Sequence, residues 1–359
     1  MIKGHGNNIY DYKSKIKIDF SSNIAFNSQS DKVIEHLRER MYLVNNYPDP
    51  EALELKSRLV EHHQRKNNLI NVSESEILVV NGSAEAFYLI AYMLSEFFFA
   101  REGKCRTCIL TPSFAEYEDS CKLYKHSIDY LDIKEFENQN FEDYNSVWLG
   151  VPNNPNAYVI EIKQVLEKCR LYADTYFVID LAYSSLCLGF DIIIDKLPPN
   201  LIIINSLTKS FGIPGLRLGY LIAEESLIAN LSNMRPPWNV NALALEAGKY
   251  ILDHYDSLKP NLEELLAESK FLQFEIQKIK GINIFPSNTN FFLCELVPEE
   301  LNSAIDVSRL KNDLVEQYGI LIRDCSNFRT LSTRHFRIAA QSREFNMALI
   351  MALKHILQN

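Results

Sequence analysis

Residues 206–220 read Ser-Leu-Thr-Lys-Ser-Phe-Gly-Ile-Pro-Gly-Leu-Arg-Leu-Gly-Tyr, and one residue separates them from the apolar run Leu201–Ile204. An uninterrupted apolar run of this length predicts a strand that is buried on both faces of a sheet. Ser206, Thr208 and Lys209 then lie at the carboxyl end of this strand, where open α/β sheets bind their ligands. The stretch therefore predicts an α/β fold with a ligand site beside Lys209.

The side chains of this stretch suit a covalent site for a phosphorylated aldehyde. The amine of Lys209 can form a Schiff base, and it becomes a better nucleophile when it is partly buried beside a cation such as Arg217. The hydroxyls of Ser206 and Thr208 and the planar guanidinium of Arg217 can bind the phosphate through hydrogen bonds. The alternative is a solvated loop lysine, but hydroxyls and a cation at these spacings favour a functional site.

Four other short apolar runs end in polar or turn residues and are followed by helical patterns. Strands that alternate with helices in this way predict a mainly parallel central sheet that is flanked by helices. The polar residues that follow the strands should therefore meet at one edge of the sheet. The runs are Ile77–Val80, Cys108–Thr111, Val147–Val151 and Tyr176–Ile179.

Asp180 closes the run Tyr176–Ile179, so its carboxylate projects from the end of a buried strand. An unpaired charge at such a place costs roughly several kcal/mol, and it therefore needs a cationic partner. A protonated pyridine nitrogen is such a partner, and retaining that proton makes the ring an electron sink. An isolated aspartate is more often a turn or cap residue, but Tyr183 three residues later and Lys209 farther on favour a catalytic role.

The segment Asn81–Ala86 lies between a predicted strand and the helical run Phe87–Leu94. Backbone N–H groups at the start of a helix bind phosphate, so we expect Ser83 and Ala84 to contribute to the phosphate site. Many strand-to-helix turns contain Gly-Ser for conformational reasons alone. The prediction that Ser83 and Ala84 bind phosphate therefore depends on the presence of the Lys209 motif in the same chain.

Three side chains that follow other strand ends can complete a cofactor site. Phe114 follows Pro112-Ser113 and is expected to stack on an aromatic ring. Asn154 and Tyr183 can each donate a hydrogen bond to a phenolic oxygen on that ring. Together with Lys209 and Asp180, they supply the contacts that pyridoxal 5'-phosphate (PLP) requires.

The pattern changes near residue 242. The long amphipathic segments Ala242–Leu252 and Leu262–Ile279 are followed by alternating strands near residues 290–296, 320–322 and 336–339. This order predicts a smaller α+β domain. We therefore divide the chain into an N-terminal segment, 1–40, that packs on the small domain, a large PLP-binding α/β domain, 41–245, and the small domain, 246–359.

Composition excludes several classes of function. The 359 residues carry a net charge of −9 with scattered lysines and arginines, which argues against a nucleic-acid partner. No apolar run reaches the ~20 residues of a membrane span, and the first residues have no signal-peptide character, so we expect a cytoplasmic protein without a membrane partner. An anionic substrate would need a local basic pocket.

Cysteine and histidine usage gives no sign of a metal site. Seven cysteines in a long chain are expected to be reduced. Cys105 and Cys108 form the one Cys-x-x-Cys, but it leads into a predicted strand and has no second ligand pair. We expect His62 and His63, in a charged helical stretch, to lie on a solvated face.

The lysine motif resembles that of fold-type-I PLP-dependent enzymes, in the class I/II aminotransferase family. Further blocks extend the resemblance along nearly the whole chain. Within the family they look most like threonine-phosphate decarboxylases, followed by histidinol-phosphate aminotransferases. The blocks are His5–Ile9, Asp19–Ile24, Tyr47–Asp49, Phe114–Tyr117, Ser206–Tyr220, Pro237–Ala244 and Ile320–Cys325.

The resemblance implies a PLP-dependent lyase or aminotransferase, with decarboxylation of L-threonine O-3-phosphate to aminopropanol phosphate, a cobalamin precursor, as the best interpretation. Transamination of histidinol phosphate or of another small amino acid is the alternative. A non-catalytic PLP-binding regulator is a distant alternative, since such a protein would need an added helix-turn-helix. The resemblance also implies a homodimer with shared active sites, in which Tyr47 reaches the phosphate of the neighbouring subunit's cofactor. By itself, Tyr47-Pro48 predicts only a rigid turn.

The resemblance also points to substrate-binding residues. Arg337 occupies the position that holds the substrate α-carboxylate in the family, and a bidentate guanidinium fits a carboxylate. Arg323, with His5 and Asn23, could hold a second anion such as a phosphate. Which arginine binds which group stays open at this point. So does the choice between decarboxylation and transamination, because it depends on which bond is held perpendicular to the ring.

The chain departs from the usual family pattern in two places. Family members usually have Asn-x-Asn-Pro-x-Gly where this chain has Asn23–Ser28, and Asn-Pro-Thr-Gly where it has Asn154–Ala157. Both changes leave the cofactor contacts intact. We therefore expect them to bear on the substrate rather than on PLP.

Overall fold

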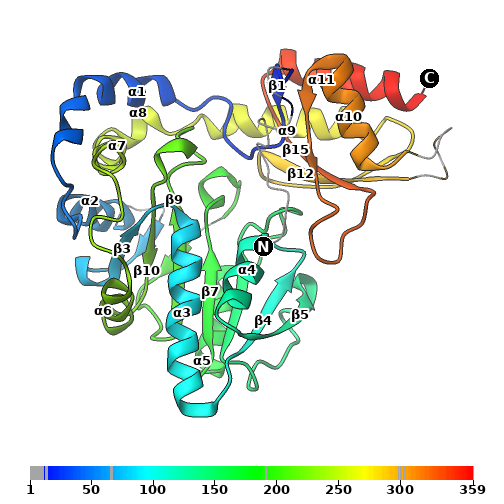
Figure 1. The fold of residues 1–359 in the computed structure, drawn as a ribbon. Coiled ribbons are helices and arrows are strands. Elements are labelled where there is room, and N and C mark those ends of the chain that lie inside the picture. The colour runs from blue at the N-terminus through cyan, green and yellow to red at the C-terminus, as the bar shows by residue number, and fades with distance from the viewer. Residues whose placement is uncertain are drawn as a thin grey trace.

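A seven-stranded sheet forms the centre of the larger part of the chain (Figure 1). The structure is a computed structural model that describes residues 12, 15–64, 68–190, 192–297, 299, 301 and 305–358. The strands lie in the order β3-β10-β9-β7-β6-β4-β5, and all are parallel except β10. Their bounds are β3 Ile77–Val80, β4 Arg106–Thr111, β5 Ser127–Asp132, β6 Ser146–Gly150, β7 Tyr176–Asp180, β9 Leu201–Ser206 and β10 Gly219–Ile222. The mainly parallel sheet and its five predicted strands are confirmed.

Alternate residues of these strands pack into two separate hydrophobic cores. Leu201 and Ile203 face one core, whereas Ile202 and Ile204 face the other. Helices therefore cover both faces of the sheet, and the long α3 lies across one of them (Figure 1). The helices of this large part are α1 Ser30–Glu39, α2 Leu53–His63, α3 Ser83–Glu102, α4 Ala115–Leu123, α5 Ile162–Leu171, α6 Glu225–Met234, α7 Ala242–Asp253 and the short α8 Tyr255–Leu258. A small parallel pair, β2 Asn68–Ile70 and β8 Ile192–Ile194, lies apart from the main sheet.

The small part is built on a four-stranded antiparallel sheet in the order β11-β12-β15-β14. Figure 1 shows α9 running from the large part into the small one. The predicted smaller α+β unit is confirmed. Its elements are α9 Leu262–Ile276, β11 Ile282–Phe285, β12 Phe291–Leu296, α10 Val307–Tyr318, β13 Ile320–Leu321, β14 Arg323–Asp324, β15 His335–Ala339 and α11 Arg343–Gln358.

The N-terminal segment touches both parts. Its strand β1 (Ile18–Asp19) pairs in parallel with β13, and Phe20 joins the core of the small part. Val33 and Leu37 of α1 instead belong to the core of the large part. The division of the chain at residues 40 and 245 stays a prediction.

The two histidines predicted on a solvated face are buried, so that prediction is wrong. His63 lies 2.9 Å from the hydroxyl of Tyr220, and burial lowers its pKa to about 3. The reason is that Leu55 and Leu59 turn the inner face of α2 to the core, and His62 and His63 continue that face by one turn. In the part of the chain that the structure describes, no helix is both long and apolar enough to cross a membrane.

All seven cysteines are free, as their number and spacing predict, and all seven are buried. Burial raises the pKa of Cys105 and of Cys108 to about 12. A redox-active thiol needs a lowered pKa and access to solvent, and these two have neither. The Cys-x-x-Cys is therefore part of the core.

Candidate cofactor and substrate site

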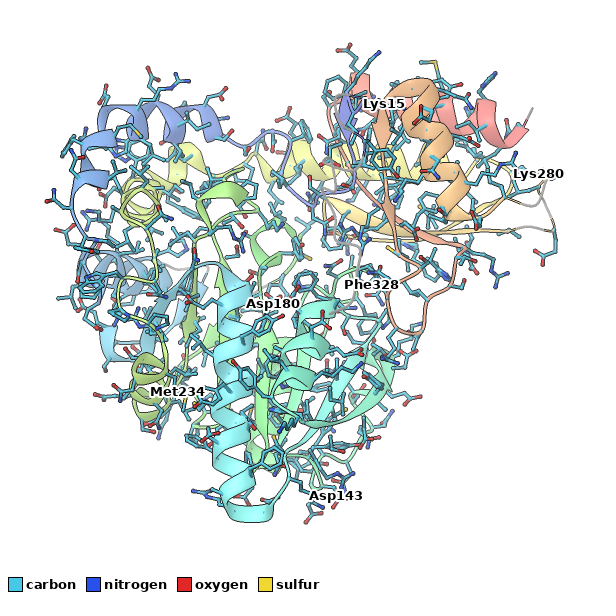
Figure 2. The ribbon with its side chains drawn as sticks, viewed as in Figure 1. Lys15, Asp143, Asp180, Met234, Lys280 and Phe328 are labelled. Carbon is cyan, nitrogen blue, oxygen red and sulfur yellow. The ribbon has the colours of Figure 1, made fainter. Side chains whose placement is uncertain are left out.

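A cavity of about 300 Å³ lies at the carboxyl ends of the central strands, below the small part. Figure 2 shows Asp180 near the middle of the view and Phe328 on the loop that descends from the small part beside it. All predicted cofactor-binding residues except Tyr47 line this cavity. So do the predicted substrate residues except His5, which lies outside the described residues. The predicted residues brought together are Asn23, Ser83, Ala84, Phe114, Asn154, Asp180, Tyr183, Ser206, Thr208, Lys209, Arg217, Arg323 and Arg337.

Strand order explains why these residues meet. The strands β6, β7 and β9 are parallel neighbours, and Gly150 pairs with Asp180 in register. The segments that follow these strands therefore leave the sheet side by side. Strand β10 runs the other way, with Gly219 opposite Ser206, so Arg217 approaches the same edge from the opposite direction.

Several groups that can bind a phosphate surround one end of the cavity. The hydroxyls of Ser206 and Thr208 are 2.8 Å apart, and α3 begins at Ser83, where first-turn N–H groups have no acceptor within the helix. Gly82 precedes it with φ 78°, and a Cβ atom built there would lie 2.5 Å from Nη2 of Arg217. Only glycine therefore lets the guanidinium lie against the start of this helix.

Asp180 is buried at the base of the cavity. Its Oδ2 accepts a hydrogen bond of 2.8 Å from the hydroxyl of Tyr117, and its Oδ1 accepts one of 3.0 Å from the N–H of Ala182. Burial raises the pKa of Asp180 to about 6, although both hydrogen bonds and the nearby Lys209 oppose the rise. A cation beside this carboxylate would remove much of the desolvation cost.

The raised pKa of Asp180 predicts how the stability of the apoprotein depends on pH. The folded state holds this proton up to about pH 6, whereas the unfolded state releases it near pH 3.8. Folding stability should therefore fall as pH rises between these values, by about 3 kcal/mol from this group. We expect Asp180→Asn to lose that pH-dependent component in urea unfolding at pH 4 and pH 8. An unchanged difference between the two pH values would contradict the raised pKa.

The lysine and the aromatic residues are held by the structure around them. Lys209 is half-buried, and its carbonyl accepts a hydrogen bond of 3.1 Å from the N–H of Ala25. Tyr183 packs edge-on against Phe291 with ring centroids 4.9 Å apart. Phe114, at the N-cap of α4, lines the cavity as predicted for a stacking residue.

Two buried arginines face each other across neighbouring strands of the small part. Arg323 on β14 pairs in register with Arg337 on β15, and the two residues are 8% and 4% exposed. Burial and the charge of Arg337 lower the pKa of Arg323 to about 10, against the opposing effects of Cys325 and Asp324. Two buried guanidiniums on directly paired residues of neighbouring strands favour a bound anion between or beside them.

Arg337 also orients Asn154. Its guanidinium donates to Oδ1 of Asn154 and to the carbonyl of Ser21, the latter at 2.6 Å. With Oδ1 occupied, the Nδ2 group is what Asn154 can offer to a ligand, in agreement with its predicted role as a donor. Nε of Arg337 has no hydrogen-bond partner among the described residues.

Asn23 presents a second unsatisfied group to the cavity. It is 1% exposed, and neither polar atom of its side chain has a partner within the described ranges. A buried amide without partners costs roughly 1–3 kcal/mol, so a bound ligand is a natural partner for it.

The cavity also contains residues that the sequence did not single out. Phe328 lies on the loop between β14 and β15, and Arg323 stacks over its ring at 5.1 Å. Arg329 anchors this loop by an ion pair of 2.8 Å with Glu118 on α4. Burial by itself raises the pKa of Glu118, but hydrogen bonds from Arg329 and Lys122 lower it to about 2. This contact could not be predicted, because the residues of the loop show no periodic pattern in the sequence.

The other lining residues that were missed are mostly small or backbone contributors near predicted positions. The exception is Glu116, whose carboxylate accepts a hydrogen bond of 2.9 Å from Tyr88. These residues are Ser21, Ser22, Ile24, Ala115, Glu116, Ala182 and Pro214.

Tyr47 lies outside the cavity of its own chain. It follows the 3-10 helix Met41–Asn45, is 81% exposed, and packs its ring on Trp238 at 4.7 Å. Its expected contact with a neighbouring subunit stays a prediction.

The residues present fit PLP. The phosphate would lie among Ser83, Ser206, Thr208 and Arg217, where hydroxyls, helix N–H groups and a cation converge. The buried carboxylate of Asp180 matches a protonated ring nitrogen. Lys209 supplies the amine that holds an aldehyde covalently.

Comparisons with known proteins agree with this chemistry. The profile of the family "Aminotransferase class I and II" matches residues 15–352. The chain is 33% identical to a provisionally named threonine-phosphate decarboxylase of Caldanaerobacter subterraneus subsp. tengcongensis, over 98% of this chain and 93% of the relative. It is 30% identical to the histidinol-phosphate aminotransferase of Clostridium novyi, over 95% of this chain and 92% of that protein.

A solved structure is similar over the same length. The crystal structure of L-threonine-O-3-phosphate decarboxylase from Porphyromonas gingivalis superposes with a TM-score of 0.86 at 31% identity, covering 96% of this chain and 100% of that one. The chain therefore belongs to the class I and II aminotransferase family and is a PLP-dependent enzyme.

Proposed function

We propose that this enzyme decarboxylates L-threonine O-3-phosphate, releasing carbon dioxide and aminopropanol phosphate, which would serve cobalamin assembly. The observation that carries the proposal is the pair of buried arginines, Arg323 and Arg337, beside the unsatisfied amide of Asn23. Two cations and an amide suit a substrate with two anionic groups. The similarity to threonine-phosphate decarboxylases supports the same substrate.

Each arginine is assigned to one anion in this proposal. Arg337 binds the α-carboxylate, since its Nε is unpaired and its other nitrogens are anchored by Asn154 and Ser21. Arg323, with Asn23 and His5, binds the phosphate. Arg323 also donates to Asn327 at 2.9 Å, which holds its guanidinium on the side of the loop that carries Phe328.

Each of the predicted side chains would have a defined role in the reaction. Bound PLP would supply an electron sink for the substrate Cα, and Asp180 would keep its ring nitrogen protonated. Asn154 and Tyr183 would donate hydrogen bonds to its phenolic oxygen, and Phe114 would pack against its ring. Arg337 would bind and orient the substrate carboxylate, and this orientation would select the bond from Cα to the carboxylate for cleavage. Lys209 then delivers a proton to Cα in place of the lost carbon dioxide.

A direct assay separates decarboxylation from amino transfer. The PLP-loaded enzyme is incubated with L-threonine O-3-phosphate labelled in its carboxyl group, and released carbon dioxide is counted. We expect release without any added keto acid. Amino exchange that requires a keto acid, with no carbon dioxide, would refute the decarboxylase and support a histidinol-phosphate type of aminotransferase, which the 30% identity to such an enzyme favours as the second candidate.

We also propose that the enzyme works as a homodimer with shared sites. Large apolar side chains are exposed around the segment that carries Tyr47, and a second copy of the chain would cover them. Removing these side chains from water at an interface would stabilise a two-fold dimer. They are Met41, Tyr42, Val44, Tyr47, Leu53 and Trp238. The seven free thiols support the expected cytoplasmic location, since reduced cysteines persist there.

Mixing two inactive variants tests whether Tyr47 serves the neighbouring subunit. In a mixed dimer of Tyr47→Ala and Lys209→Ala, one site would contain both intact residues, and the other would contain neither. We therefore expect the re-associated mixture to recover about a quarter of the wild-type activity, because half of the dimers are mixed. Activity no higher than the average of the two separate variants would show that Tyr47 does not act across the interface.

A further inference from the structure

Asp180 is held from two sides by groups of different elements. The N–H of Ala182, two residues farther along the chain, binds Oδ1, and the phenol of Tyr117 on α4 binds Oδ2 at 2.8 Å. A carboxylate with one hydrogen bond can rotate about its χ2 angle, whereas two bonds to opposite oxygens fix its plane. Tyr117 is therefore the contact that converts a tethered carboxylate into an oriented one.

The surroundings of Tyr117 leave it few other positions. It is 3% exposed, and its ring packs edge-on against Phe87 with centroids 5.0 Å apart and against Phe114 at 6.0 Å. Trp148 lies on another side at 6.2 Å. Aromatic packing of this kind favours one ring orientation. The hydroxyl is thereby directed to Asp180.

Gly150 makes room for this hydroxyl. It ends β6 directly beside Asp180 in register, and a Cβ atom built on it would lie 3.1 Å from Oη of Tyr117. That distance is shorter than a relaxed contact between carbon and oxygen. Any larger residue at position 150 would press on the phenol where it meets the carboxylate.

The same turn of α4 also carries the predicted stacking residue. Phe114 caps the helix, and the N–H of Tyr117 donates to its carbonyl at 3.2 Å. The side chain expected to lie against the ring face and the side chain behind Asp180 therefore come from one rigid turn. A shift of this turn would move both contacts together.

We propose that Tyr117 is a positioning residue, which acts through Asp180 to hold the carboxylate in the plane and the ionised state that the ring nitrogen of PLP requires. The inference rests on the proposed role of Asp180. The charged and titratable groups that face this carboxylate are Lys209 from the loop after β9 and Tyr117 from α4. Tyr183 in turn interacts electrostatically with Tyr117. Burial and the carboxylate keep the pKa of Tyr117 well above its usual value, so the phenol stays a donor.

The effect of removing the hydroxyl has a definite sign. Tyr117→Phe removes a hydrogen bond that lowers the pKa of Asp180, so this pKa should rise further above about 6. PLP needs the ionised carboxylate of Asp180. As the pH is lowered, the affinity of the variant for PLP should therefore begin to fall at a higher pH than that of the wild type. We expect Tyr117→Phe to weaken PLP binding about 10-fold at pH 7, the scale of one hydrogen bond to a charged group.

The experiment measures the dissociation constant of PLP from pH 5 to pH 9, by fluorescence, for five purified apoproteins. Tyr220→Phe is the matched control, since Tyr220 is also a buried tyrosine with one hydrogen bond, made to His63. It should bind PLP as the wild type does. Gly150→Ala should reproduce the shift of the pH transition to higher pH seen in Tyr117→Phe, with the tyrosine itself unchanged. Thermal unfolding of each apoprotein establishes that it is folded.

Asp180→Asn completes the set and distinguishes the two proposals. If it weakens PLP binding and removes the pH dependence while Tyr117→Phe and Gly150→Ala match the wild type, the role of Asp180 stands and that of Tyr117 is refuted. If Asp180→Asn also binds PLP normally, both are refuted. A weakened affinity whose pH transition lies at a higher pH in Tyr117→Phe and Gly150→Ala, with a normal Tyr220→Phe, supports the positioning role.

Discussion

Replacing Lys209 by alanine is expected to lower kcat by at least about 10⁴-fold, because the variant loses both the covalent anchor of the cofactor and the proton donor to Cα. The cup formed by Ser83, Ser206, Thr208 and Arg217 would remain, so PLP should still bind, but without covalent attachment. The visible absorbance of the bound cofactor should change accordingly. After borohydride reduction, the mass of the denatured protein should include PLP only in the wild type.

Lys209→Arg is the sharper companion to this variant. Arginine keeps the positive charge beside Asp180, but its guanidinium is a poor nucleophile and does not release a proton near neutral pH. We therefore expect it to be as inactive as the alanine variant. Retention of covalently bound PLP in either variant would show that another amine is the attachment point and that the assignment of Lys209 is wrong.

Removing either buried arginine is expected to lower kcat/KM by about 10²–10³-fold, the cost of leaving a buried anion without its partner. Arg323→Met and Arg337→Met keep much of the side-chain volume while they remove the charge. Arg337→Met also leaves Oδ1 of Asn154 and the carbonyl of Ser21 without their donor, so part of its effect should appear in kcat. Arg343→Met is the matched control, since Arg343 is an exposed arginine that pairs with Glu268.

The reaction product assigns each arginine to its anion. Aminopropanol phosphate retains the phosphate but lacks the carboxylate, so its inhibition constant reports the phosphate contact alone. We expect Arg323→Met to weaken product inhibition about as much as it weakens substrate binding, and Arg337→Met to leave product inhibition within about threefold of the wild type. The reverse pattern would exchange the two assignments. Equal effects on both ligands would mean that the arginines bind one anion together.

Much of the fold could be predicted because its strands are short apolar runs between helical patterns. Leu201–Ile204 is buried on both faces, as its composition requires, and the polar residues behind it line the cavity. Parallel strands with helical crossovers place their carboxyl ends at one edge, so Asn154, Asp180 and Lys209 could be expected to converge without any knowledge of distances. The cofactor site was predictable for this reason.

Strands β5 and β10 were not predicted. The segment Gly219–Ile222 is part of the lysine motif, and four residues are too few to show whether they pair in parallel or antiparallel. Its antiparallel placement between β3 and β9 brings Arg217 to the start of α3, where Gly82 makes room for it. The burial of His62 and His63 was missed for a related reason, since the charged residues around them hide the inner face of the helix.

The stretch from Ser206 to Tyr220 carries in its own residues the lysine, the hydroxyls and the arginine of a PLP site, because these groups lie within one strand and the turn after it. The partners that make those groups work come from distant segments. Tyr117 reaches Asp180 across 63 positions of the chain, and Arg337 reaches Asn154 across 183. Local sequence specifies strand ends and turns, but pairing, register and burial depend on the whole chain. The orientation of Asp180 and Asn154, and the meeting of two arginines above them, therefore follow only from the tertiary structure.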